Sequence, residues 1–237
     1  MHRPTGLQSL FPALATQTPP GQLLRLSSQE CQELANLLDI LAQGERVAMR
    51  GARQQIAVAP DKKTRAFLRL QAGHEAFHAF VFDASALWLR GRGKRKNKTT
   101  PQLDWFAEQT NDAVRKQDFT ESLLCQQVVL EGLGHIVLER IDRELSERGI
   151  QWSRLRRLML EQETHHHVFG IDKFTEALAR QPDRLPELTR KARTLVTTAE
   201  ELLDELAEPL AIMEVDAGEY MTQMRAEMPA VLQGAMS

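Results

Sequence analysis

Two short segments of this chain repeat the same pair of residue types at the same spacing. Glu75 and His78 lie three residues apart, and Glu163 and His166 repeat this Glu-x-x-His spacing. Residues three apart are neighbours on one face of an α-helix. The face that carries Glu75 also carries apolar residues at alternating steps of three and four, so we expect it to be buried. A buried carboxylate beside a buried imidazole is costly unless a partner compensates it, and the fold must provide that partner.

The composition favours helices over strands. Hydrophobic residues make up 42% of the 237 residues, and Val, Ile and aromatic residues are sparse beside Leu, Ala, Glu, Arg and Gln. We therefore expect an all-α protein, and the length suits a single domain with a sizeable core. The formal net charge of −2 argues against a dedicated nucleic-acid-binding protein, so nucleic acid is not an expected partner.

The sequence also bears on the cellular setting. Cys31 and Cys125 are the only cysteines and lack the spacing of a disulfide framework, which favours a reducing, cytoplasmic compartment. Pro12 interrupts the apolar run within residues 1–26, so we expect a loose N-terminal arm and no cleaved signal peptide. No segment approaches the roughly 20 apolar residues that cross a bilayer, and a membrane partner is not expected.

The spacing of apolar residues and helix breakers predicts a succession of helices in one domain, residues 27–237. Ser27 and Ser28 are candidate N-caps of the first helix. The predicted helices cover residues 27–58, 61–90, 102–109, 112–148, 152–180, 185–206 and 209–232. We expect residues 27–180 to form an antiparallel four-helix bundle. The additional helices within 183–234 are expected to pack across it, where they could limit substrate entry or form the surface of a homodimer.

The turn at Pro60 sets the relative height of two acids. Glu45 lies fifteen residues before Pro60, and Glu75 lies fifteen residues after it. Because an α-helix rises about 1.5 Å per residue, two antiparallel helices would bring these carboxylates to the same level. Glu131 and Glu163 lie at comparable distances on either side of the next long turn, so they too are expected at similar heights.

The predicted helices thus bring together four acids and two imidazoles that suit a pair of metal ions. The candidate ligands are Glu45, Glu75, His78, Glu131, Glu163 and His166. Four carboxylates offset the charge of two divalent ions, and each imidazole adds one nitrogen ligand. Without a cation, four buried acids would repel one another and take up protons. The alternative is that these six residues lie on solvated faces of their helices.

With these residues, the chain over 27–180 resembles the ferritin-like superfamily of non-haem di-iron proteins. In that superfamily, one Glu from each of two helices and a Glu-x-x-His pair from each of the other two bind the metals. The chain is more similar to the oxidase and oxygenase branch than to ferritin storage proteins. That branch includes aldehyde-deformylating oxygenases, whose third helix resembles the stretch 118–135 (DFTESLLCQQVVLEGLGH), and tRNA-modifying hydroxylases.

The resemblance implies that the six candidate ligands bind two Fe ions, with Mn or a mixed Fe/Mn pair as alternatives. It implies an enzyme that activates O2 to oxidise or hydroxylate a small, mostly apolar substrate, with electrons from an external donor. Three other functions stay open. The chain could be an iron-handling protein with ferroxidase activity, a tRNA hydroxylase that uses the basic loop at 91–101, or a helical interaction module without metal.

Three residues close to the candidate ligands bear on how the site would work. Members of the superfamily often carry Asp immediately before the Glu of the second motif, hydrogen-bonded to a ligand histidine, and Gln162 stands at that position here. Phe82 occupies the position one turn beyond the first motif where radical-generating members carry Tyr, so a stored tyrosyl radical is not expected. His135 follows Glu131 by one turn and is interpreted as an extra ligand, a proton donor or a core histidine.

Small and polar residues could shape the surroundings of this site. Gly132 and Gly134 flank the predicted position of Glu131, where they could leave room for substrate or let a neighbouring helix approach. We expect a pocket there, largely apolar because of Phe82 and its neighbours. Gln71 lies on the inward face one turn before the first motif. The remaining histidines of the two motif segments are rotated by about 100° from the ligand line and are expected in helix interfaces or solvent.

Overall fold

The computed structural model describes residues 26–91, 100–147, 153–211 and 217–233. These residues form helices and contain no strand, which confirms the predicted all-helical class for the part of the chain described. The expected N-terminal arm lies outside the described residues except for Leu26, and so does most of the basic loop at 91–101. No described helix is both long and apolar enough to span a bilayer.

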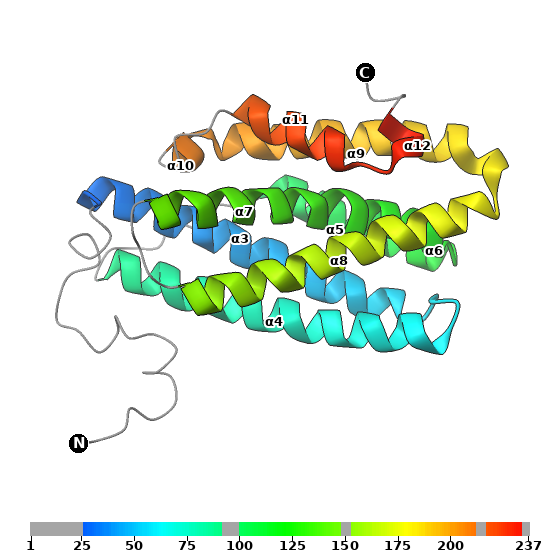
Figure 1. Ribbon diagram of the computed structural model, residues 1–237, viewed down its shortest axis with the longest axis horizontal. Helices are drawn as coiled ribbons and strands as arrows, with labels where there is room; N and C mark the ends of the chain where they lie inside the picture. Colours follow the sequence, from blue (N-terminus) through cyan, green and yellow to red (C-terminus); the bar gives the residue numbers. More distant parts are fainter. Residues whose placement is uncertain (1–25, 92–99, 148–152, 212–216, 234–237) are drawn as a thin grey trace.

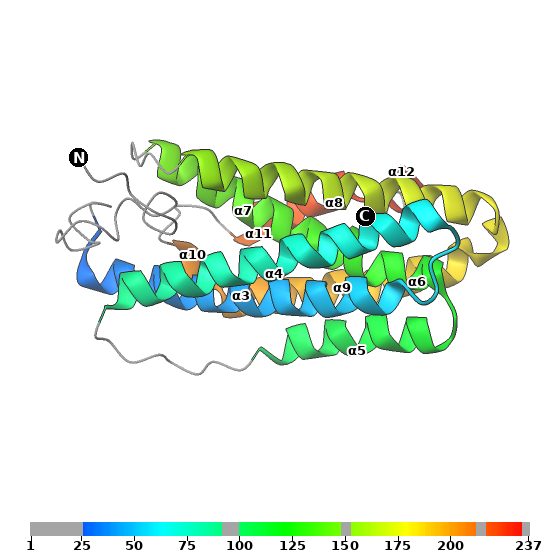
Figure 2. The ribbon, with the colours of Figure 1, turned by 90° about the horizontal axis from the view of Figure 1, so that it is seen from below.

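The first two long helices form an antiparallel hairpin. Helix α3, Ser28–Gln55, begins at a capping box in which the side chains of Ser27 and Glu30 bind each other's backbone N–H groups. Helix α4, Lys62–Arg90, begins at Asp61, whose side chain accepts the backbone N–H of the residue three positions later. The two helices lie side by side along their length in both views (Figures 1 and 2).

The helix predicted over residues 112–148 does not begin at residue 112, so its predicted start is wrong. Helix α5 runs from Pro101 to Arg115, well past the expected end at residue 109. Gln117 then adopts a left-handed conformation with φ 58°, which breaks the helix. Asp118 caps the next helix, α6 (Phe119–Leu123), with its side chain.

A π-helix continues from α6. This segment, η2, spans Leu124–Leu130 and leads directly into α7, Glu131–Glu147. The backbone N–H of Glu131 donates to the carbonyl of Gln126, five residues earlier. Residues five apart are therefore stacked here, which a regular α-helix does not allow. The amphipathic pattern of the sequence did not predict this extra residue per turn.

The chain then turns back through α8, Ser153–Ala179, into a group of C-terminal helices. They are η3 (Pro182–Arg184), α9 (Leu185–Glu205), α10 (Ala207–Ala211), α11 (Ala217–Glu227) and α12 (Ala230–Gln233). The expectation of one helix over 209–232 is wrong: Pro209 lies inside α10, and Pro229 separates α11 from α12. The fixed φ of proline and its missing N–H disfavour a continuous helix there.

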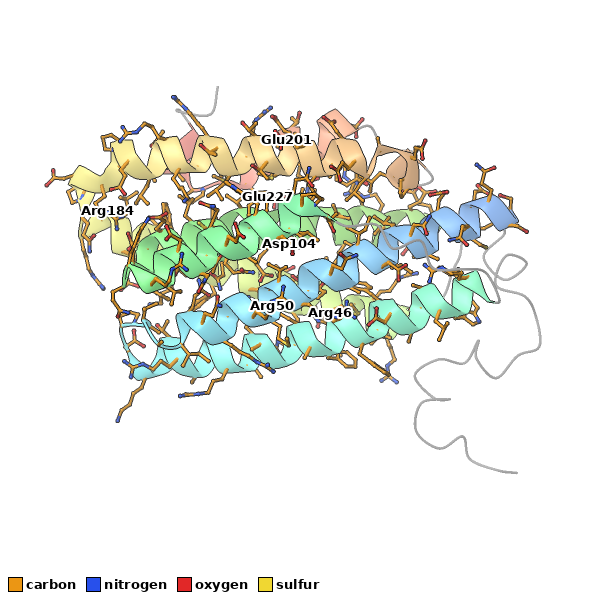
Figure 3. The ribbon with its side chains drawn as sticks, turned by 180° about the vertical axis from the view of Figure 1, so that it is seen from behind. Arg46, Arg50, Asp104, Arg184, Glu201 and Glu227 are labelled. Atoms are coloured by element: carbon orange, nitrogen blue, oxygen red, sulfur yellow. The ribbon has the colours of Figure 1, made fainter. Side chains whose placement is uncertain are left out.

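The helices form layers around one main core. Helices α4 and α8 lie on one side, α9 to α12 lie on the other, and α3, α5 and α7 lie between them (Figures 1 and 2). The buried core contains residues of α3, α4, α7 and α8 and of α9 and α11. Charged side chains such as Arg50 and Glu201 lie on the outer surfaces (Figure 3), and Arg184 binds Asp118 with two hydrogen bonds.

One glycine of α8 permits a close helix contact. A Cβ atom built on Gly170 would lie 2.3 Å from the Cβ of Gln127 and 3.1 Å from its carbonyl carbon. We expect Gly170→Ala to destabilise the protein by about 1–3 kcal/mol, because the backbone of η2 would have to move. The matched change Gly73→Ala meets no atom within 4 Å and should stabilise by about 0.5–1 kcal/mol. Chemical denaturation of the metal-free variants measures both effects; equal stabilities would refute a tight α8–η2 contact.

Candidate metal centre

The structure brings all six candidate ligands together in the centre of the helical core. They form two groups, each with ligand atoms within 4.8 Å of one another. The first group contains Glu45, Glu75, His78 and Glu163, and the second contains Glu75, Glu131, Glu163 and His166. Glu75 and Glu163 belong to both groups. Such sharing is the arrangement in which two carboxylates bridge a pair of cations.

The distances between ligand atoms are short. The Nδ1 atom of His78 lies 2.7 Å from Glu163 Oε1, 3.2 Å from Glu75 Oε2 and 3.6 Å from Glu45 Oε2. On the other side, the Nδ1 atom of His166 lies 2.9 Å from Glu75 Oε1, 3.9 Å from Glu163 Oε2 and 4.0 Å from Glu131 Oε2. Each imidazole therefore faces three carboxylates, and two of the three are the shared ones.

These close approaches do not have the geometry of hydrogen bonds. Both carboxylate oxygens of Glu75, Oε1 of Glu163 and the Nδ1 atoms of His78 and His166 are buried and have no hydrogen-bond partner. Buried polar atoms normally find a partner, because leaving one unpaired costs about 1–3 kcal/mol. These five atoms without hydrogen-bond partners belong to the two ligand groups. Carboxylate oxygens and imidazole nitrogens both bind divalent cations, so a cation in each group would satisfy them.

The opposite nitrogen of each imidazole is already occupied. His78 Nε2 lies 2.8 Å from the amide oxygen of Gln162, and His166 Nε2 lies 3.0 Å from Nδ1 of His74. If Nδ1 binds a metal, Nε2 must carry the proton and donate it, so Gln162 and His74 act as acceptors. Burial and the neighbouring His166 lower the pKa of His74, which keeps it neutral for this role. Such partners orient metal-binding histidines.

His74 was not identified from the sequence, where it was expected in an interface or solvent. It precedes the Glu of the first motif, as Gln162 precedes the Glu of the second, and each reaches across to the other helix's histidine. This shared position is the signal that could have predicted it.

We expect His74→Leu to weaken metal binding about 10- to 100-fold, because His166 loses its acceptor. His74→Gln should restore most of the affinity, since it recreates the amide found at Gln162. Competition with a chromophoric chelator measures the affinities. Equal affinities for the leucine and glutamine variants would show that His74 only fills space.

Glutamine side chains hold Glu131 in place. The amide groups of Gln71 and Gln126 both donate to its Oε1 atom, at 2.8 and 3.2 Å. This leaves Oε2 to face the site. Gln126 reaches Glu131 because the π-helix stacks residues five apart. The side-chain amide of Gln127 donates to Gln71 and exchanges hydrogen bonds with Gln55. Gln55 also donates to the hydroxyl of Ser122 in α6.

The electrostatics of the site favour a bound cation. Burial and the charge of Glu163 raise the pKa of Glu45 well above its usual value. Burial and the charge of Glu75 raise the pKa of Glu131 in the same way. Burial would also raise the pKa of Glu75, but the two ligand imidazoles lower it to about 2. Glu45 and Glu131 therefore tend to hold protons in the metal-free protein, and a divalent ion would displace them.

The remaining predicted residues lie around this centre. His135 belongs to neither ligand group; its ring stacks on that of His167 with 5.9 Å between centroids. A Cβ atom on Gly132 would lie 2.9 Å from Cε1 of His167, so this glycine permits a close approach of α8 and does not open a pocket. Gly134 lines a cavity together with ligand residues.

Two mainly apolar cavities occur in the part of the chain that the structure describes. One has a volume of about 110 Å³ and is lined by Phe82, Trp88 and Leu145 among others, but by none of the six ligands. The other has a volume of about 60 Å³ and borders directly on Glu45, Glu131 and Glu163. Only the smaller cavity therefore gives a molecule direct contact with the candidate ligands.

Comparisons with protein-family models, with curated proteins and with solved structures found no significant match to this chain. A functional assignment therefore depends on the chemistry of the site itself.

Proposed function

We propose that this protein is a ferritin-like four-helix-bundle enzyme with a di-iron centre that activates O2 to oxidise or hydroxylate a small, mostly apolar substrate. Mn or a mixed Fe/Mn pair would occupy the same ligands. Electrons would come from an external donor. Helices α3, α4, α7 with η2, and α8 would make up the bundle, and α9 to α12 would cover one side of it.

The observation that carries this proposal is the pair of ligand groups that share Glu75 and Glu163. Four carboxylates and two imidazoles supply a hard, mostly anionic donor set that suits iron or manganese. When bound, the metal pair would supply the electrons that reduce O2. The apolar cavity beside three of the ligands argues for an oxidising enzyme, because an apolar substrate needs a water-free place next to the reactive centre.

The chain's own residues would prepare the site for this reaction. Gln71 and Gln126 hold Glu131 so that only one of its oxygens faces the centre. Gln162 and His74 would fix the rings of the two ligand histidines. The surrounding apolar side chains would exclude water and so protect oxidising species from side reactions.

The first test is the metal content of the purified full-length protein, followed by rapid mixing of its anaerobic ferrous form with O2. We expect about two irons per chain and a transient visible absorption band during oxidation. Failure to bind metal after reconstitution would refute the proposal. Oxidation without a transient band, combined with assembly into a shell-sized particle, would favour the ferroxidase alternative.

A further inference from the structure

The smaller cavity lies between the metal ligands and the C-terminal helices. Its lining includes Glu45 of α3, Glu131 of α7 and Glu163 of α8, which are the only polar side chains among its lining residues. All three are candidate metal ligands. With the three carboxylates engaged by a cation, a molecule inside would find no other hydrogen-bonding side chain in that lining, so the cavity would favour apolar ligands.

Two of the residues that line the cavity are glycines. Gly44 of α3 immediately precedes the candidate ligand Glu45, and Gly134 of α7 follows the candidate ligand Glu131 by three positions. A Cβ atom built on either glycine would meet no other atom within 4 Å. Neither glycine is needed for a close helix contact, and neither has a positive φ. Glycine weakens a helix by about 1 kcal/mol relative to alanine. The structural effect of these two glycines is therefore the space that they leave open beside the helix.

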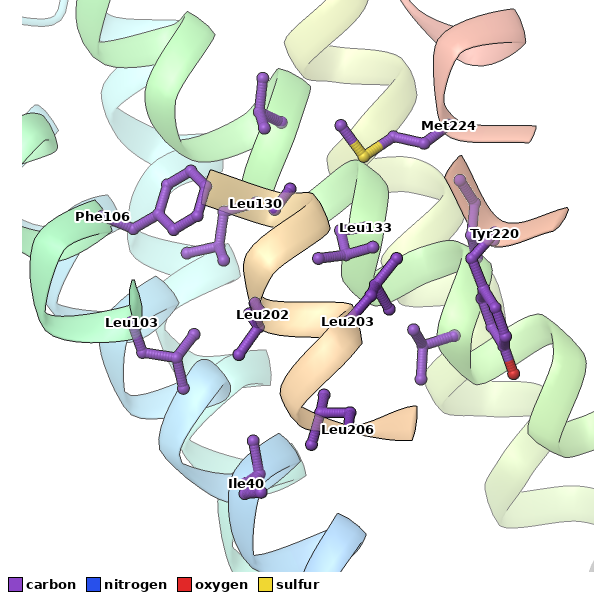
Figure 4. Close-up of a cluster of buried hydrophobic side chains, with 14 of the residues drawn as sticks. Ile40, Leu103, Phe106, Leu130, Leu133, Leu202, Leu203, Leu206, Tyr220 and Met224 are labelled. Carbon is purple, nitrogen blue, oxygen red and sulfur yellow. The ribbon is translucent and has the colours of Figure 1, made fainter. Parts of the chain in front are cut away.

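Helix α9 forms one wall of the cavity, which is partly open to solvent. Figure 4 shows Leu202 and Leu203 of α9, and Leu206 just after the end of α9, near Leu133 of α7 and Leu103 of α5, all of which line the cavity. These five leucines are buried. Helix α9 thus forms part of the cavity wall beside the three buried carboxylates.

We propose that this cavity is the compartment in which O2 and the slim end of an apolar substrate meet the metal centre, and that Gly44 and Gly134 set its width. This inference rests on the proposed function. The volume of about 60 Å³ holds a molecule of the size of O2 or an unbranched alkyl end. It is well below the cavity of about 150 Å³ that admits benzene.

Xenon is a suitable probe, because it binds apolar cavities of small volume and needs no metal. We expect the wild-type chain, metal-free and iron-loaded, to bind xenon in ¹²⁹Xe NMR titrations but not benzene. Gly44→Val and Gly134→Val should each weaken xenon binding at least about tenfold, because their side chains fill the cavity. The same variants should slow oxidation of the ferrous protein by O2 about tenfold, with unchanged iron content.

Gly73→Val is the matched control, since Gly73 also has no atom within 4 Å of its Cβ position but lies on the exposed face of α4. It should leave xenon binding and O2 oxidation unchanged. Leu203→Ala should admit benzene; Leu206→Ala tests the same point if the first variant does not fold. Xenon binding that is unaffected by both valine variants would overturn the inference.

The two proposals fail in different ways. Iron bound at about two per chain without any xenon binding would refute the cavity and leave the di-iron function standing. Xenon binding that is blocked by the valine variants, in a chain that never binds iron, would leave a cavity but refute the di-iron function. In that case the assignment of the cavity to O2 and substrate would fail with it.

Discussion

Glu75→Ala and Glu163→Ala should each abolish the binding of both ions of the proposed metal pair, whereas Glu45→Ala and Glu131→Ala should each remove about one. The reason is the membership of the two ligand groups: Glu75 and Glu163 contribute to both, while Glu45 and Glu131 contribute to one each. Loss of a shared carboxylate removes a ligand from each ion and the charge that offsets their mutual repulsion. Loss of a single-group ligand leaves the other group of four donors complete.

Metal analysis after dialysis against a fixed free-metal concentration measures this directly. We expect roughly two ions for the wild type, roughly one for Glu45→Ala and Glu131→Ala, and close to none for the two shared positions. Glu161→Ala, an exposed glutamate on α8, is the control and should retain both ions. Retention of one tightly bound ion by Glu75→Ala and by Glu163→Ala would contradict the bridging arrangement.

The stability of the metal-free protein should fall as the pH rises above about 5. Glu131 has a raised pKa because of burial and the charge of Glu75, so the folded state keeps a proton that the unfolded state has lost. Burial would lower the pKa of His78, but the surrounding carboxylates raise it. Above the usual histidine pKa, the folded state therefore keeps the proton of His78 too, and stability again falls as the pH rises. Each extra proton of the folded state makes stability decline by up to about 1.4 kcal/mol per pH unit.

Glu131→Gln should flatten this pH dependence and stabilise the metal-free protein at pH 7 to 8, because the amide imitates the protonated carboxyl. Its oxygen can still accept from Gln71 and Gln126. The same variant should lose much of the stabilisation that added metal gives to the wild type. Urea denaturation at several pH values, with and without Fe²⁺ or Mn²⁺ under anaerobic conditions, measures both effects. A variant as pH-sensitive as the wild type would disprove the raised pKa of Glu131.

The parts of the site that follow from regular helix geometry could be predicted from the sequence. The Glu-x-x-His spacing fixes two ligands on one face of a helix. Equal counts on either side of Pro60 predicted that Glu45 and Glu75 lie at one level, and the structure places them in one ligand group. These inferences need only the rise and period of an α-helix.

The parts that depend on departures from regular geometry could not be predicted. A π-helix adds a residue to a turn, and no apolar spacing in 124–130 indicated it; without it, Gln126 would not stack on Glu131. The break at Gln117 depends on one left-handed residue of a type that rarely adopts that conformation. The role of His74 was not predicted because its partner, His166, lies on another helix, and the spacing within α4 does not indicate that contact.

The two ends of the ligand set differ in freedom of movement. Two amide groups clamp Glu131, whereas Glu45 accepts no amide hydrogen bond from the part of the chain that the structure describes. Both of these carboxylates border the cavity, and the Oε2 atom of Glu45 lies 3.6 Å from Nδ1 of His78. A carboxylate without such hydrogen bonds would be freer to change its position beside a bound ion. If the proposed metal pair binds here, we therefore expect the side chain of Glu45 to change its position more readily than that of Glu131.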